Sequence, residues 1–109
     1  MEQVFVIEFG MGIDLHGQDV TKAAVRAVRD AIGHNSLPGM RTVVGGDIAR
    51  MQVHVRLAVP ADADKLDHET VKAALPYGEV TIEVVPGGMI APGGREPIYV
   101  VNACIEVGK

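Results

Sequence analysis

The stretch MQVHVRLAVP, residues 51–60, decides the fold, because apolar and polar side chains alternate along it. A period of two is typical of a β-strand that is buried on one face only. The apolar face would consist of Met51, Val53, Val55, Leu57 and Val59, and the opposite face of Gln52, His54 and Arg56. The stretch therefore predicts a sheet with one face in the core.

Three further strands and two helices surround this strand. Strands are predicted at residues 4–9, 79–85 and 97–107, which are rich in β-branched or aromatic side chains. Helices are predicted at residues 20–32 and 67–75. The order β-α-β-α-β-β predicts an α+β fold, a two-layer sandwich in which two helices cover one face of one mixed four-stranded sheet. Residues 1–109 leave room for a single domain.

The bare face of this sheet should carry His54 and Arg56. If the first strand turns Phe5 and Phe9 toward the helices, Glu8 joins them on the bare face, and this is the arrangement we predict. The opposite setting would put the two aromatic side chains on the bare face and turn Glu8 inward. Because the face is too apolar for a simple solvated surface, we expect a homo-oligomer.

The composition argues against several classes of protein. The chain carries 10 Lys and Arg against 14 Asp and Glu, so its net charge of -4 gives no long-range attraction to nucleic acid. The one cysteine, Cys104, cannot form an internal disulfide, which fits a reducing cytoplasm. We see neither a signal peptide nor a run approaching ~18 apolar residues. We therefore expect a cytoplasmic protein without nucleic-acid or membrane partners.

The stretch GMGIDLHGQD, residues 10–19, joins the first strand to the first helix. Its glycines, Gly10, Gly12 and Gly17, would let the backbone approach a ligand, and the helix after Asp19 would offer free N–H groups. The stretch is neither a Walker A loop nor a dinucleotide fingerprint. We predict that the three glycines and Asp19 bind a small anion. The alternative is a tight turn in which Asp19 only caps the helix.

Asp14 and His16 add titratable groups that a plain turn does not require, so we predict that both are catalytic. With Asp19 they also form a D-x-H-x-x-D pattern that could hold a divalent metal. Such spacing is common by chance and Asp19 is needed for the cap. We therefore assign no metal and no other cofactor.

His54 and Arg56 are neighbours on one face of their strand. With Glu8 or Glu83 nearby, they could form an acid–base centre or a clamp for an anionic substrate. We predict that His54 is catalytic and that Arg56 and Glu8 bind the ligand. The alternative is a network of salt bridges at a subunit interface.

The stretch HNSLPGMR, residues 34–41, lies at the far end of the first helix, about 20 Å from Asp19 by helical rise. Its polar members are His34, Asn35, Ser36 and Arg41. They could meet the glycine stretch only across a subunit boundary. The alternative is a helix end at which His34 complements the dipole.

The leading hypothesis is a small oligomeric enzyme, or enzyme-like pocket protein, that acts on a small polar anionic metabolite. Its site would lie at a subunit interface, with Asp14 or His16 within about 10 Å of His54 or Arg56. The alternatives are a non-catalytic binding or regulatory module and a purely structural oligomer.

The stretch FGMGIDLHGQDVTKAAVRAVRDAIGHNSLPG, together with VHVRLAVP and VVPGGMIAPGG, resembles the Lin family. This is a conserved hypothetical bacterial group first catalogued from Listeria. The resemblance covers nearly the whole chain. It implies no activity and no catalytic residues.

Overall fold

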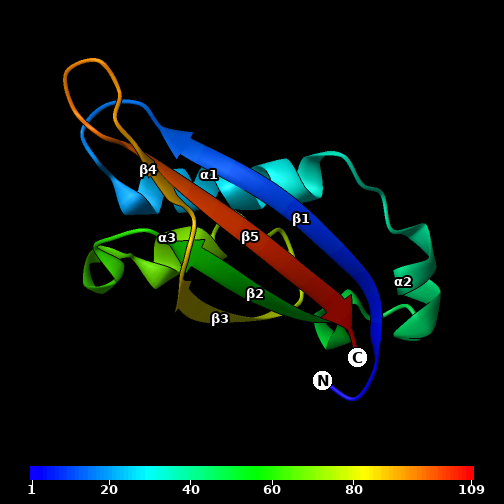
Figure 1. The fold of residues 1–109 in the computed structure, drawn as a ribbon. Helices are drawn as coiled ribbons and strands as arrows, with labels where there is room; N and C mark the ends of the chain where they lie inside the picture. Colours follow the sequence, from blue (N-terminus) through cyan, green and yellow to red (C-terminus); the bar gives the residue numbers. More distant parts are fainter.

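Five strands form one mixed sheet, and helices pack on one of its faces (Figure 1). The computed structural model describes residues 1–109. The strands are β1 (Val4–Asp14), β2 (Gln52–Val59), β3 (Glu79–Pro86), β4 (Met89–Ala91) and β5 (Ile98–Gly108). The helices are α1 (Val20–Gly33), α2 (Pro38–Val43) and α3 (His68–Lys72). The predicted α+β sandwich with one mixed sheet is confirmed.

The strand order is β1-β5-β2-β3, with β4 paired to β5. β5 runs antiparallel to both β1 and β2, whereas β2 and β3 are parallel. β4 pairs with the first residues of β5, and β2 pairs with the later ones, so both strands lie on the same side of β5. In this arrangement His54 and Arg56 of β2 lie opposite Thr81 and Glu83 of β3, and His54 also lies opposite Glu106 near the end of β5.

Two elements were not predicted, and the second predicted helix is shorter than expected. Residues 33–50 were expected to form a loop, but Pro38 occupies the first position of α2, where its fixed φ suits a helix. β4 is hidden in a segment rich in Gly and Pro. α3 covers residues 68–72 of the predicted 67–75. The longest helix, α1, has 14 residues, and no helix is long and apolar enough to cross a membrane.

The core lies between the sheet and the helices. The predicted apolar face of β2 is buried, and its members are Met51, Val53, Val55, Leu57 and Val59. β5 contributes the alternate set Tyr99, Val101, Ala103, Ile105 and Val107. The half-buried strand that decided the fold is thus confirmed.

The contact between β1 and α1 explains Gly10 and Gly12. Both glycines lie inside β1, which runs five residues beyond the predicted end at Phe9, so the prediction that they form a ligand-binding loop is wrong. A Cβ on Gly12 would overlap the backbone of Ala23 and Ala27, and one on Gly10 the backbone of Ala27 and Ala31. The glycines therefore allow the helix to lie directly on the strand.

The setting of β1 in the sheet is the opposite of the predicted one. Gly10 and Gly12 face α1, and Glu8 shares their face by alternation, with only 4% of its surface exposed. Phe9 lies on the bare face instead and is 74% exposed, whereas Phe5 falls in the register shift between Val4 and Val6. The prediction that Glu8 joins His54 and Arg56 on the bare face is therefore wrong, because α1 requires small residues beneath it.

Side chains of α1 also cover part of the outer edge of β1. The backbone N–H of Met11 donates to Asp30 Oδ2 at 2.9 Å. Arg26 Nη1 donates to the carbonyl oxygen of Ile13 at 2.7 Å. These groups point away from β5, so the helix satisfies an edge that has no neighbouring strand.

Candidate functional site

Glu8 is the one buried carboxylate that the fold leaves unsatisfied. Its Oε2 atom is inaccessible to solvent and has no hydrogen-bond partner. Burial raises the pKa of the Glu8 carboxyl above its ordinary value, and the Asn35 side chain opposes this only in part. An unpartnered buried carboxyl costs stability, and such groups are concentrated at functional sites.

Glu8 lines a cavity of about 220 Å³ on the helix side of the sheet. Asn35, Ser36 and Tyr77 supply its other polar groups, and aliphatic side chains such as Val53 supply most of the remaining wall. No Lys, Arg or His side chain lines this cavity. We call it the Glu8 cavity.

The cavity forms where α1 ends. Gly12 lies against Ala23 and Ala27, and Gly10 lies against Ala27 and Ala31, so a two-residue step along β1 matches about one helical turn. The next step reaches Glu8, but α1 stops at Gly33. The chain then turns away, and this leaves the space that Glu8 faces.

Asn35 fixes this end of the helix. Its side-chain amide donates to the carbonyl oxygen of Ala31 at 2.8 Å, and its backbone N–H donates to Ile32. Asn35 thereby satisfies a carbonyl that the end of the helix leaves free. The same residue and the following Ser36 then form one wall of the Glu8 cavity.

A second cavity of about 190 Å³ adjoins the first. The two share four lining residues, Ser36, Leu37, Met51 and Tyr77. Arg41 of α2 lines only the second cavity, and none of the ion pairs in the chain includes it. We call this space the Arg41 cavity.

Asp14, a predicted catalytic residue, is a structural neighbour of α1. It is 3% exposed, its Oδ2 accepts the backbone N–H of Asp19 at 2.8 Å, and its Oδ1 lies 3.6 Å from Arg26 Nη1. Asp19 in turn caps α1 by accepting the N–H of Lys22 at 3.0 Å. The cap is confirmed as the alternative reading of Asp19, and both carboxylates are engaged in holding the helix.

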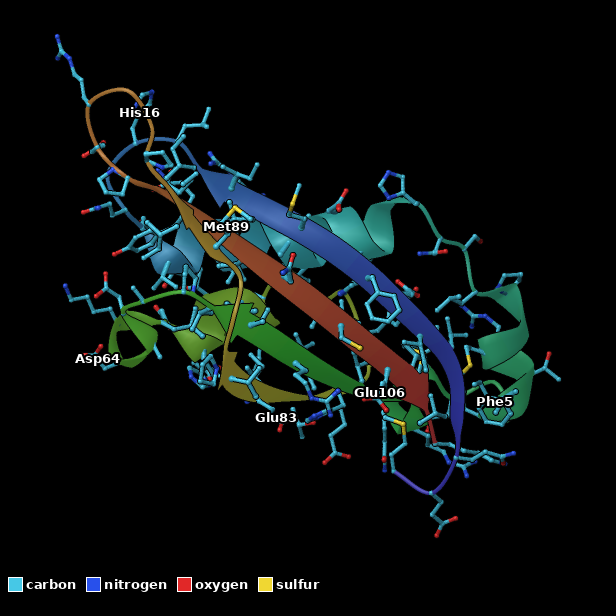
Figure 2. The ribbon with its side chains drawn as sticks, viewed as in Figure 1. Phe5, His16, Asp64, Glu83, Met89 and Glu106 are labelled. Carbon is cyan, nitrogen blue, oxygen red and sulfur yellow. The ribbon has the colours of Figure 1, made fainter.

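His16 and Gly17 lie on an exposed turn. The side chain of His16 is 90% exposed, and its Nδ1 is 4.0 Å from Glu96 Oε1. The same Glu96 oxygen accepts the N–H of Gly17 at 2.7 Å and ties this turn to the loop before β5. In Figure 2, His16 lies at the end of the molecule where these two loops project. A catalytic role for His16 and a ligand-binding role for Gly17 stay untested predictions.

His54 and Arg56 lie on the bare face within a polar ladder that also contains Thr81, Glu83 and Glu106. His54 Nδ1 is 2.8 Å from Thr81 Oγ1, and its Nε2 is 3.1 Å from Glu83 Oε2. Arg56 donates to Glu83 at 2.9 Å and to Glu106 at 3.2 Å. Figure 2 shows Glu83 at the edge strand β3 and Glu106 toward the C-terminal end of β5.

The charged side chains of the ladder pair with one another. Hydrogen bonds from His54 and then Arg56 lower the pKa of the Glu83 carboxyl. The Glu83 and Glu106 carboxylates raise the pKa of Arg56 in return. Because the guanidinium already serves two carboxylates, the arrangement matches the interfacial salt-bridge network that was the alternative for these residues.

The predicted meeting of the glycine stretch with His54 and Arg56 does not occur within one chain. Asp14 pairs with Tyr99 of β5, whereas Arg56 pairs with Cys104 of the same strand. At ~3.3 Å per residue and ~4.8 Å between strands, Asp14 and Arg56 lie about 19 Å apart. They also point to opposite faces, so the two groups do not meet within one chain, and the separation of about 10 Å expected in the assembled protein stays a prediction.

The metal pattern is not assembled either. No group of three or more His, Cys, Asp or Glu side chains lies close enough together to hold a metal ion. Asp14 and Asp19 are engaged with backbone N–H groups, as described above.

The sequence analysis missed Tyr77 and Met51 as cavity residues and misplaced Glu8. A signal for Glu8 was present, because Ala23, Ala27 and Ala31 recur every four residues along α1. A stripe of small residues permits close approach of another backbone, as do Gly10 and Gly12. Pairing the two patterns would have turned Glu8 toward the helix.

The chain resembles a family of unassigned function. A family model described as a conserved hypothetical protein, Lin0512, matches residues 4–107. No curated protein matches the chain significantly. A crystal structure of an FtsZ-like protein of unknown function from Nostoc punctiforme is similar, with a TM-score of 0.88 and 39% sequence identity. The match covers 96% of this chain and 93% of that one.

Proposed function

We propose that the chain, which belongs to the Lin0512 family of conserved hypothetical proteins, binds a small molecule in the Glu8 cavity and exchanges a proton with it. The observation that carries the proposal is the Glu8 side chain, which is buried, has no hydrogen-bond partner at Oε2 and lines an open cavity. A ligand in the cavity would lie against this side chain. This is the enzyme-like pocket protein expected from the sequence, with its site at the opposite end of α1.

The environment of Glu8 suits proton transfer. A carboxyl whose pKa is raised by burial can hold its proton closer to neutral pH and release it to a ligand. The absence of a cationic side chain from the lining means that the group meeting Glu8 is a hydroxyl, carbonyl, amide or amine. The aliphatic wall favours an apolar body behind that group.

NMR spectroscopy with uniformly ¹³C-labelled protein tests this proposal. We expect small phenols, amides or amines at millimolar concentration to shift the resonances of Val53, Leu75 and Ile105 and to move the pKa of Glu8. Glu8→Gln should weaken binding at least fivefold. Glu83→Gln, which removes a carboxylate on the other face, should leave binding unchanged. Equal binding to the wild type and Glu8→Gln would remove Glu8 from the site.

We also propose that copies of the chain associate through the bare face of the sheet. Ile7, Phe9, Met11 and Met89 lie on this face and are each between one half and three quarters exposed. At ~200 Å² for a fully exposed side chain of this size, they present roughly 480 Å². That approaches the ~800 Å² that each partner buries in a standard interface.

The charges of the bare face favour a second copy over a charged partner. With His54 neutral, the one arginine and two glutamates of the polar ladder leave a net charge of -1, which disfavours an acidic partner. Figure 2 shows Met89 on the short strand β4, which lies across this face. In a cytoplasm, the half-buried thiol of Cys104 on the same face would stay reduced.

Light scattering tests the association. We expect a mass that is a multiple of 11.5 kDa at micromolar concentration. Phe9→Glu should give the monomer, whereas Leu15→Glu, at an exposed apolar residue beyond β1, should not. A wild-type monomer at this concentration would contradict the proposal.

A further inference from the structure

We infer that the ligand of the Glu8 cavity is a small organic acid whose carboxylate is held by Arg41, so that one molecule occupies both cavities. This inference rests on the proposed function of Glu8 and adds the chemical class of its ligand.

The dimensions of the two cavities support one ligand across both. The Arg41 cavity measures about 190 Å³ and the Glu8 cavity about 220 Å³. Each alone is smaller than the ~300 Å³ at which the usual range of ligand sites begins. Together they fall within that range, and the four shared lining residues show that the cavities adjoin.

The residues between the two ends favour an apolar middle. Leu37 and Met51 line both cavities, so a molecule reaching from Glu8 to Arg41 would pass along their side chains. Ser36 also lines both and can donate a hydrogen bond to an oxygen between them. An aromatic ring or a short alkyl chain fits this middle section.

The chemistry of the two ends is complementary to a bifunctional acid. Arg41 is an exposed arginine that lines the second cavity without an ion-pair partner, and a guanidinium matches the two oxygens of a carboxylate. Glu8 requires a hydrogen-bonding group and would repel a second carboxylate when ionised. The ligand class is therefore an acid with a hydroxyl, carbonyl or amino group at its other end.

Three probes separate these contributions: 3-(4-hydroxyphenyl)propanoate, its methyl ester, and 3-phenylpropanoate. The first has both end groups, the ester lacks the anion, and the third lacks the hydroxyl. We expect the wild type to bind the first probe at least tenfold more tightly than either analogue, with NMR shifts at Leu37, Val53 and Leu75. Dissociation constants come from the same titrations.

Variants assign each end. Arg41→Gln should reduce binding of the hydroxy acid to the level of its ester and leave the ester unaffected. Arg29→Gln, which removes an exposed arginine from α1, controls for the loss of charge and should change nothing. Glu8→Gln should weaken the hydroxy acid more than 3-phenylpropanoate.

The outcomes distinguish the inference from the proposed function. Equal binding of acid and ester, with Glu8→Gln weakening both, would overturn the role of Arg41 and keep the Glu8 site. Binding of the hydroxy acid that is insensitive to Arg41→Gln would also overturn the role of Arg41 and keep the Glu8 site. An absence of shifts at cavity residues with all three probes at millimolar concentration would count against both, because an open cavity of this kind should admit them.

Discussion

Asp14 and Glu8 both point from β1 toward the face of the sheet that α1 covers, but the two carboxylates have different surroundings. Asp14 meets the first turn of the helix, where the N–H of Asp19 and the guanidinium of Arg26 satisfy it. Glu8 meets the place where the helix has ended, and its Oε2 has no partner. Both side chains are buried on the same face of the same strand.

The difference shows that burial alone does not mark a functional carboxylate. Asp14 is at least as inaccessible as Glu8, yet its contacts account for it within the fold. Glu8 borders a cavity and lacks such contacts, so its presence calls for a ligand. The following changes test this comparison, beginning with the contact on which both ends depend.

Gly12→Ala should have the largest effect. The added Cβ would overlap backbone atoms of α1, which cannot move aside as a side chain could, so we expect a loss of about 3 kcal/mol or more in the free energy of unfolding. Gly33→Ala, where a Cβ meets nothing within 4 Å, is the control and should change stability by less than ~1 kcal/mol. Urea unfolding measures both. Similar values for the two variants would contradict the close contact.

Asp14→Ala should destabilise the chain by about 2 kcal/mol, because it leaves the N–H of Asp19 without its acceptor and removes the ion pair with Arg26. Asp19→Ala removes only the helix cap and should cost about 1 kcal/mol. The same urea titrations rank the two. An Asp14→Ala variant as stable as the wild type would make Asp14 available for the catalytic role predicted from the sequence.

Glu8→Gln, unlike the changes above, should raise the free energy of unfolding relative to the wild type as the pH rises. The folded protein holds the Glu8 proton at pH values where the unfolded chain, with a pKa near 4.5, has lost it. Wild-type stability is therefore fully present below pH 4.5 and falls as the pH rises through the folded pKa. We expect the variant to gain stability relative to the wild type as the pH rises from 4 to 8. If the difference in stability between the variant and the wild type stays constant over this range, ionisation of Glu8 does not destabilise the folded protein.

Glu83→Gln should have the smallest effect, since the ladder is exposed. The pKa of Glu83 is lowered by its bonds from His54 and Arg56, so its contribution is present above pH 4.5 and is lost as the pH falls through the folded pKa. The variant should be slightly less stable than the wild type at pH 7 and equal to it near pH 3. Glu79→Gln, an exposed carboxylate on the same strand, should show no such trend. If the stability of Glu83→Gln follows the same pH dependence as that of the wild type, the ladder adds no stability in solution.

Local pattern predicted the regular elements well. The helix at 20–32 agrees with α1 to one residue, since its apolar period and the Asp19 cap are both local signals. The short strand β4 could not be predicted, because its three residues lie among glycines and prolines and are held by pairing with β5. The end of β1 was predicted too early because glycine usually signals a turn, whereas here it admits a helix.

The site depended on a choice that local pattern left open. Alternation in β1 fixes that Phe9 and Glu8 face opposite ways, but not which of them faces the core. Apolar preference favoured the aromatic side chain inside, and the close approach of α1 reversed this outcome. Asn35, Ser36 and Arg41 were recognised as a polar group at the helix end, yet only the fold places them around the two cavities beside Glu8.

The contacts of Asp30 and Arg26 with the outer edge of β1 also bear on how assemblies of this chain could grow. A strand edge with free N–H and C=O groups can recruit the same edge of another molecule and extend into a fibre. Here the N–H of Met11 and the carbonyl oxygen of Ile13 are already hydrogen-bonded to side chains of α1. Extending the sheet through this half of β1 would first require breaking one hydrogen bond at each residue. Growth by addition of strands is thereby opposed at this half of β1, and β3, at the other edge of the sheet, is left as the edge to which a strand could add.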